Sequence, residues 1–138
     1  MTTPRVTGKS RTKEPRRRRV GLFKYKFDIA AAKDGPFHTI EALVDTGSLY
    51  TWIPGATLRG AGLDPTGTRS FQLADGQIIQ RDIVEAIVRL DGDVAHTICV
   101  FGGDRDQTLL GALTLEQFSL AADPVNKRLV PMPAIPAY

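Results

Sequence analysis

An acid, a hydroxyl and a glycine stand together where an apolar run of this sequence ends. In "ALVDTGSLYTWIP" (residues 42–54), Asp45, Thr46 and Gly47 directly follow three apolar residues. A carboxylate at the end of a buried strand costs free energy unless it is hydrogen-bonded or has a functional role. Gly47 lets the backbone turn closely and frees its amide for an ionised oxygen, while Ser48 is expected to donate to the same carboxylate and Thr46 to lock the loop. The triplet therefore predicts a carboxylate at the floor of a cleft, where it binds and polarises water.

One such carboxylate cannot hydrolyse a peptide bond alone, because the reaction needs a base for the water and an acid for the leaving group. The chain has no second Asp-Thr-Gly or Asp-Ser-Gly triplet. Asp34, Asp75 and Asp91 directly precede glycines and are interpreted as turn residues. The second carboxylate is therefore expected from another copy of the same loop across a two-fold axis, with one proton shared between the pair. The sequence predicts a homodimer.

Strands are expected on both sides of the triplet. Residues 23–29 alternate between apolar and polar side chains, with the period of two that is typical of a half-buried strand. "HTIEALV" (residues 38–44) predicts a second strand that runs into Asp45, and "LYTWIP" (residues 49–54) a third that Pro54 ends. The triplet is thus predicted to lie on the loop between two strands.

The second half of the chain is expected to be mainly β as well. Asp-Gly pairs at 75–76 and 91–92 predict two hairpin turns, and "KRLVP" (residues 127–131) predicts a closing strand. Helical spacing is found in "TLEQFSL" (residues 114–120), with Thr114 as the expected cap. One short helix after Gly111 is therefore predicted in a β domain.

"DTGSLYTWIP" resembles the active-site signature of pepsin-type aspartic proteases, in which a Trp-hydrophobic-Pro sequence follows DTGS at this spacing. A second family mark is two hydrophobic residues and a glycine before a short helix, the support beneath the catalytic loop. The size of the chain and its single triplet are similar to the retropepsin-like, homodimeric branch. The resemblance implies a single-domain closed β-barrel of the acid-protease type and the activity of an aspartic endopeptidase. It implies catalytic roles for Asp45, Thr46 and Gly47, and supporting roles for Ser48, Leu109, Leu110 and Gly111.

The same resemblance implies a flap over the substrate, formed by "FQLADGQIIQ" (residues 71–80). An extended peptide would bind beneath it as an added strand. This segment lacks the glycine-rich tip of the viral enzymes and the tyrosine of the pepsins. Ala112 replaces the viral arginine after the Leu-Leu-Gly position, and Leu49 and Tyr50 stand where its acidic partner would be. The expected substrate-binding residues of the flap are Leu73, Ala74, Asp75, Gly76 and Gln77.

Three parts are expected in the 138-residue chain: a basic tail (residues 1–20), the domain that resembles the retropepsin-like aspartic proteases (residues 21–133) and a proline-rich end (residues 134–138). The tail contains four consecutive arginines, Arg16 to Arg19, but almost no apolar side chains, so it is expected to be disordered. Since the remainder is mildly acidic, nucleic acid could bind only through the tail. Prolines in "PMPAIPAY" lack amide donors, so the dimer interface is expected to use "KRLVP" or another surface.

Other reactive side chains favour no competing chemistry. His38 and His96 lack the spacing of metal ligands and are expected to be structural residues in strands, so neither a metal nor a cofactor is predicted. The single cysteine, Cys99, excludes an intrachain disulfide and is interpreted as a buried apolar residue in a reducing compartment. With no apolar run of membrane-spanning length, a cytoplasmic location is expected.

Two other functions remain open at this stage. One is a non-catalytic dimeric module that binds peptides with the same fold, which retained binding without cleavage would indicate. The other is an RNA-associated factor that acts through its basic tail, which salt-dependent binding with and without residues 1–20 would indicate.

Overall fold

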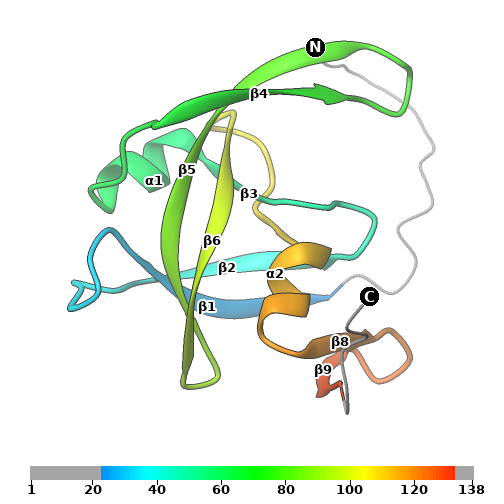
Figure 1. Ribbon diagram of the computed structural model, residues 1–138. Helices are drawn as coiled ribbons and strands as arrows, with labels where there is room; N and C mark the ends of the chain where they lie inside the picture. Colours follow the sequence, from blue (N-terminus) through cyan, green and yellow to red (C-terminus); the bar gives the residue numbers. More distant parts are fainter. Residues whose placement is uncertain (1–22, 133–138) are drawn as a thin grey trace.

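The computed structural model describes residues 23–132, and the two predicted tails lie outside this range. Figure 1 shows a barrel of strands with a hairpin rising above it and a small two-stranded sheet below. In chain order the elements are β1 (Lys24–Ala30), β2 (His38–Asp45), β3 (Thr51–Pro54), α1 (Gly55–Gly60), β4 (Gly67–Gln72), β5 (Ile78–Leu90), β6 (Asp93–Gly102), β7 (Leu109–Gly111), α2 (Ala112–Gln117), β8 (Leu120–Asp123) and β9 (Arg128–Pro131).

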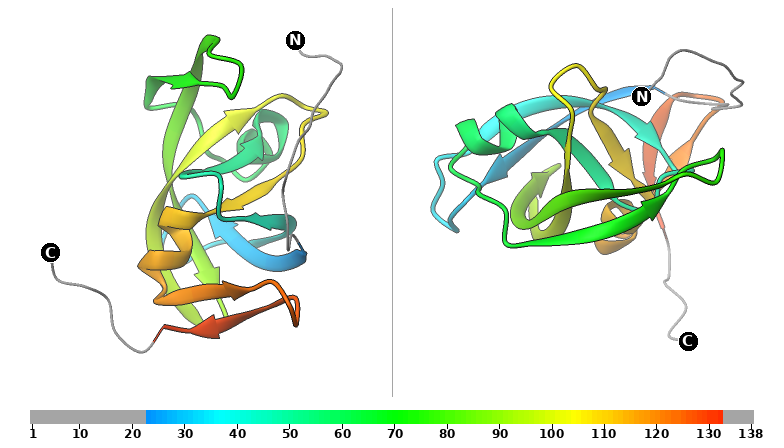
Figure 2. Two further views of the ribbon diagram at one scale, coloured as in Figure 1. Left: turned by 90° about the vertical axis from the view of Figure 1, so that its right-hand side faces the viewer. Right: turned by 90° about the horizontal axis from the view of Figure 1, so that it is seen from above.

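Six of these strands close into a barrel. The main sheet has the order β1-β2-β7-β3-β6-β5-β4, and β1 also pairs with β5. The second pairing joins the two sides of the sheet and leaves β4 outside the ring. The first half of β5 extends beyond the barrel with β4, as the side view in Figure 2 shows. The predicted mainly β closed barrel is thus confirmed.

Sequence alternation explains the strands that line the core. In β1 the side chains of Phe27 and Ile29 are buried, while those of Lys24 and Lys26 are exposed, as a period of two requires. The largest side chains with no exposure to solvent include those of Ile29, Ile53, Leu58, Leu110 and Val100. The barrel interior is therefore filled by apolar side chains from strands that are distant in sequence and from α1.

Both predicted Asp-Gly turns connect antiparallel strands. Asp91 and Gly92 join β5 to β6 and have φ angles of 51° and 91°. Positive φ at both central residues is the geometry that two-residue hairpins favour. The turn at Asp75 and Gly76 joins β4 to β5, with Gly76 at a φ of 88°.

The helices differ from the prediction. The helix after β7 begins at Ala112 rather than at Thr114, with Gly111 as its N-cap, and it ends before Leu120, which lies in β8. Thr114 is not the cap, because its buried hydroxyl bonds with other threonines of the core. A second helix, α1, was not predicted, because its six residues include two glycines and are too few to show helical periodicity.

The predicted closing strand is confirmed as β9, which pairs with β8 rather than with the barrel. Within residues 23–132, no helix has the length and apolar character needed to span a membrane.

Candidate active site

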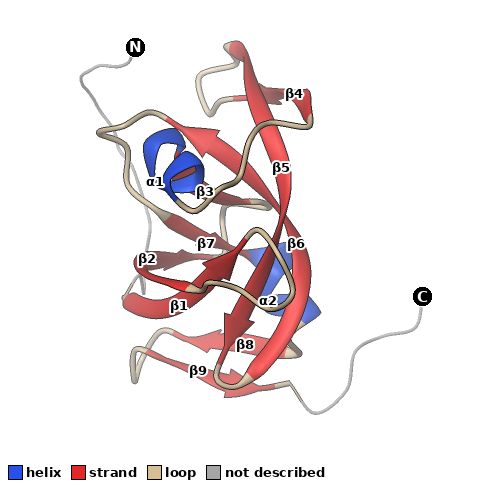
Figure 3. Cartoon of the chain, turned by 90° about the vertical axis from the view of Figure 1, so that its left-hand side faces the viewer, coloured by secondary structure: helices blue, strands red, loops and turns tan. Residues whose placement is uncertain are grey.

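Asp45 is the last residue of β2, and its position is fixed from the neighbouring strand. β2 and β7 run parallel, with Leu43 opposite Leu109, Val44 opposite Leu110 and Asp45 opposite Gly111. Figure 3 shows β7 lying between β2 and β3, the strands that precede and follow the Asp-Thr-Gly loop. The two sequence motifs, although far apart along the chain, therefore meet side by side.

The loop after β2 turns its main chain toward the carboxylate of Asp45. The Gly47 amide donates a hydrogen bond to Asp45 Oδ1 over 3.0 Å, and the Ser48 amide donates to the Asp45 carbonyl over 3.1 Å. A Cβ atom at Gly47 would lie 3.2 Å from Oδ1, which is a tight contact. With only 5% of its surface exposed, Asp45 is a buried acid with a main-chain amide directed at it. The role predicted for the Gly47 amide agrees with this geometry.

The Ser48 side chain behaves differently from the prediction. Its hydroxyl donates to the Tyr50 carbonyl over 2.7 Å, so its one proton is directed there rather than to the Asp45 carboxylate. This hydrogen bond holds the main chain of Tyr50 close to Ser48, at the end of the loop. Thr46 is exposed in the single chain. Its predicted role in locking the loop stays a prediction.

Gly111 supports the loop by close main-chain packing. A Cβ atom there would overlap the Tyr50 carbonyl and lie 2.9 Å from the Leu49 carbonyl oxygen. The Ala112 amide donates to the Ser48 carbonyl over 2.8 Å, and the Leu113 amide donates to the Leu49 carbonyl over 3.0 Å. The first turn of α2 is thus hydrogen-bonded to the residues that follow the triplet.

A buried cluster of three threonines, which the sequence analysis did not identify, connects this support to the barrel. The Thr51 hydroxyl accepts a 3.0 Å hydrogen bond from the Gly111 amide. Its oxygen is 2.7 Å from that of Thr114, which is in turn 3.0 Å from that of Thr97. Because the three residues come from β3, α2 and β6, the cluster fixes these elements around Gly111.

The predicted flap is a hairpin that packs on the segment after the loop. The Phe71 ring on β4 lies 5.8 Å from the Tyr50 ring and 5.1 Å from the Trp52 ring. At the tip, the Gly76 amide donates to the Leu73 carbonyl over 2.9 Å, and the Gln77 amide donates to Asp75 Oδ1 over the same distance. The flap residues predicted from the sequence, 73–77, are all exposed at this tip.

The remaining reactive side chains lie away from this loop or are inert. Burial raises the pKa of the Cys99 thiol to about 12, so it stays protonated and is a poor nucleophile. His38 and His96 lie in β2 and β6 with exposed side chains. Across residues 23–132 there is no group of three or more His, Cys, Asp or Glu side chains that could hold a metal ion.

Comparison with known proteins identifies this arrangement. The family model described as "Aspartyl protease" matches residues 30–113, which is more than half of the chain and includes both Asp45 and Gly111. The chain belongs to the aspartyl protease family. No curated protein matches the chain significantly in sequence.

Two solved structures resemble this chain in fold. The simian foamy virus (mac) protease matches with a TM-score of 0.50 and 18% identity, over 70% of this chain and 94% of that chain. A retropepsin-like aspartic protease from Rickettsia conorii matches with a TM-score of 0.51 and 23% identity, over 74% of this chain and 87% of that chain. The predicted family resemblance and the barrel of the acid-protease type are therefore confirmed.

Proposed function

We propose that this aspartyl protease is a homodimeric endopeptidase in which the Asp45 carboxylates of two chains activate one water molecule. The observation that carries the proposal is the single buried Asp45, with the Gly47 amide donating to its carboxylate. Since the sequence has one Asp-Thr-Gly triplet, a second copy is the natural source of the second carboxylate.

The proposed reaction uses the two carboxylates in different protonation states. Two close carboxylates cannot both ionise easily, so the pair shares a proton. The ionised carboxylate takes a proton from the water as the water oxygen attacks the peptide carbonyl carbon. The protonated carboxyl donates its proton to the carbonyl oxygen. The tetrahedral intermediate then collapses: the carboxyl that took the water proton passes it to the leaving amine, the other carboxylate takes back a proton from a hydroxyl of the intermediate, and the C–N bond breaks.

Substrate would bind as an extended strand beneath the flap, with main-chain hydrogen bonds giving affinity and side-chain pockets giving specificity. The β4–β5 hairpin supports this mode, because Phe71 packs on Tyr50 and Trp52 and so places the hairpin over the segment that follows the triplet.

The test is the cleavage of a diverse peptide mixture, read by mass spectrometry at several protein concentrations and at acidic to neutral pH. We expect discrete internal cleavages whose rate per milligram of protein rises through the concentration range in which the dimer forms. Binding of peptides without cleavage at any concentration and pH would instead support a non-catalytic peptide-binding module.

A further inference from the structure

The flap carries two arginines on the face that packs toward the rest of the domain. The β4–β5 register places Arg69 directly opposite Arg81. Phe71 is two residues after Arg69, so the two side chains share one face of β4. Because Phe71 packs on Tyr50 and Trp52, this face is turned toward the segment that follows the catalytic triplet.

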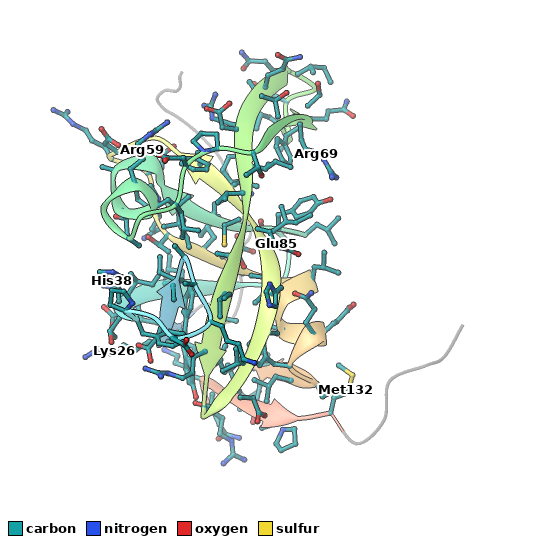
Figure 4. All side chains as sticks on the ribbon, turned by 60° about the vertical axis from the view of Figure 1, so that its left-hand side comes forward. Lys26, His38, Arg59, Arg69, Glu85 and Met132 are labelled. Carbon is teal, nitrogen blue, oxygen red and sulfur yellow. The ribbon has the colours of Figure 1, made fainter. Side chains whose placement is uncertain are left out.

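The Arg69 side chain reaches that segment. Its Nη1 donates a hydrogen bond to the Tyr50 hydroxyl oxygen over 3.2 Å. In Figure 4 the labelled Arg69 side chain extends from the hairpin. The main chain of Tyr50 is itself held at the loop, since its carbonyl accepts the Ser48 hydroxyl. The Arg69 guanidinium therefore lies between the flap and the exit of the catalytic loop.

Neither flap arginine is neutralised by an acid of the described domain. The ion pairs within residues 23–132 join Arg89 to Asp28, His96 to Glu85, and Arg128 to Asp123. Arg81 donates instead to the neutral carbonyl of Gln80, over 3.2 Å. Like charges directly opposite each other on a hairpin are unfavourable, and a guanidinium has five N–H donors, of which the Tyr50 phenol uses one. An anion between the arginines would reduce the repulsion and accept the remaining donors.

We infer that Arg69, assisted by Arg81, selects substrates with a glutamate or aspartate side chain on a residue that flanks the scissile bond. This inference rests on the proposed peptidase function. An extended peptide beneath the flap presents alternate side chains to the β4 face, and the planar guanidinium fork matches a carboxylate in geometry and charge. Arg69 contacts Tyr50, which lies beyond the triplet in the chain. The selected side chain therefore belongs to a substrate residue near the scissile bond and not to either of the two residues that share it.

The first experiment locates the acidic position and measures its effect. In the cleaved peptide mixture, we expect Glu and Asp to be enriched at one fixed position relative to the scissile bonds. Synthetic peptides with Glu, Gln or Lys at that position are then compared near pH 6 and at low salt. The ratio of kcat/KM for the Glu peptide to that for the Gln peptide should be about tenfold, the size expected of one charge-assisted hydrogen bond. The ratio should fall with added salt, and below about pH 4, where glutamate becomes protonated.

Variants then assign the preference to the flap. Arg69→Gln should bring the Glu-to-Gln ratio close to one, and Arg69→Glu should make the Lys peptide the better substrate of the Glu and Lys pair. Arg105→Gln removes an exposed arginine from the loop between β6 and β7 and should keep the preference of the unmodified protein. Equal cleavage of the Glu and Gln peptides by the unmodified protein overturns the inference while leaving the peptidase function intact.

Binding separates the two proposals if no peptide is cleaved. The unmodified protein is then titrated, at the same pH and salt concentration, with two pools of fluorescent peptides of one length. The pools are identical except that one has Glu and the other Gln at each position in turn. If the Glu peptides bind more tightly than the Gln peptides, and Arg69→Gln abolishes this difference, selection by the flap is supported and only the peptidase function is refuted. Equal binding of the two pools overturns the selection as well.

Discussion

At the scale of single residues, the orientation of Asp45 depends on the turn of the backbone that follows it. The Gly47 amide donates to Oδ1, and a Cβ atom at Gly47 would approach the same oxygen to 3.2 Å. The Gly47 amide can therefore donate to Asp45 only while residues 45–47 keep their close turn. An asparagine side chain has the same shape and still has an oxygen that accepts, so it can replace the Asp45 carboxylate without disturbing the loop.

Asp45→Asn should fold and lose catalysis. The asparagine Oδ1 can still accept from the Gly47 amide, but an amide cannot take a proton from water. We expect kcat/KM to fall by about 10²- to 10⁴-fold, the usual contribution of general acid–base catalysis. Thermal unfolding should show an unchanged or higher midpoint, since two neighbouring carboxylates no longer repel each other.

Asp64→Asn, at an exposed position before β4, is the matched control and should keep full activity. An Asp45→Asn protein that is unfolded would make Asp45 a structural residue. One that is folded and still cleaves would place the active site elsewhere.

Gly111→Ala should destabilise the domain, because the new Cβ atom would overlap the Tyr50 carbonyl. Forcing an extra atom into a packed site typically costs about 1–3 kcal/mol in the free energy of unfolding. Denaturant titration of Gly111→Ala beside Gly60→Ala provides the comparison. Gly60 lies in α1, and a Cβ atom added there would meet no other atom within 4 Å, so alanine should raise the stability by about 0.4–1 kcal/mol. Equal effects of the two substitutions would disprove the close packing at Gly111.

Asp28 should contribute to stability at neutral pH and lose that contribution in acid. Hydrogen bonds from Thr39 and Arg89, together with the Arg89 charge, hold the pKa of Asp28 below its ordinary value of 3.8. A carboxyl group whose pKa is lower in the folded state stabilises that state above its unfolded pKa, and the contribution disappears as pH falls through the folded pKa.

Thermal unfolding of Asp28→Asn from pH 7 downward tests this. The variant should have a lower midpoint than the unmodified protein at pH 7, and the two midpoints should converge below about pH 4. Thr39→Val, which removes the hydrogen bond with the largest effect, should reproduce part of the difference at pH 7. A difference that stays constant with pH would mean that Asp28 acts through packing instead.

At the scale of elements, the threonine cluster is the connection that holds β3, β6 and α2 around the site. Thr114→Val keeps the shape of the side chain but leaves the hydroxyls of Thr51 and Thr97 without their shared partner. Losing a buried hydrogen-bond partner costs about 1–3 kcal/mol, which denaturant titration can measure. Thr68→Val, on an exposed position of β4, should change stability by less than about 0.5 kcal/mol. A Thr114→Val protein as stable as this control would show that the cluster does not join the elements.

The strands and hairpins could be predicted from sequence, because their signals are local. Alternation along β1 and the Asp-Gly turn at residues 91–92 each depend on neighbouring residues alone. The Asp-Thr-Gly loop could be placed for the same reason, since β2 leads into Asp45 without interruption. Sequence patterns therefore predict those parts of the fold that depend on residues close together in the chain.

The parts that sequence reasoning missed depend on contacts between distant residues. Thr51, Thr97 and Thr114 are far apart in the sequence and meet only because the barrel brings their elements together. Thr114 consequently has the residue type of a helix cap but serves as a core hydroxyl. The Ser48 hydroxyl is predicted to donate to the Asp45 carboxylate, and only the backbone path decides that it donates to the Tyr50 carbonyl instead.

At the scale of the whole molecule, the chain provides one copy of each part of the proposed site. It has one triplet, one Leu-Leu-Gly support and, within residues 23–132, one flap hairpin. A symmetric pair of chains would duplicate all three and bring the two triplets together across the axis. Two-fold symmetry then gives each carboxylate the same surroundings, so the shared proton, and not a difference in environment, distinguishes the acid from the base.

Mixing active and inactive chains tests this arrangement directly. When the unmodified protein is exchanged with an equal amount of Asp45→Asn, random pairing leaves about a quarter of the dimers with two Asp45 carboxylates. Because the total number of dimers has doubled, activity per unmodified chain should fall to about half of its value without the variant. A larger excess of the variant should suppress activity further, as mixed dimers replace the active ones. The measurement is peptide cleavage at a concentration where sedimentation shows dimers, after time for subunit exchange, and Asp64→Asn added in place of the inactive variant should cause no loss. Undiminished activity per unmodified chain despite proven exchange would mean that one chain holds a complete active site.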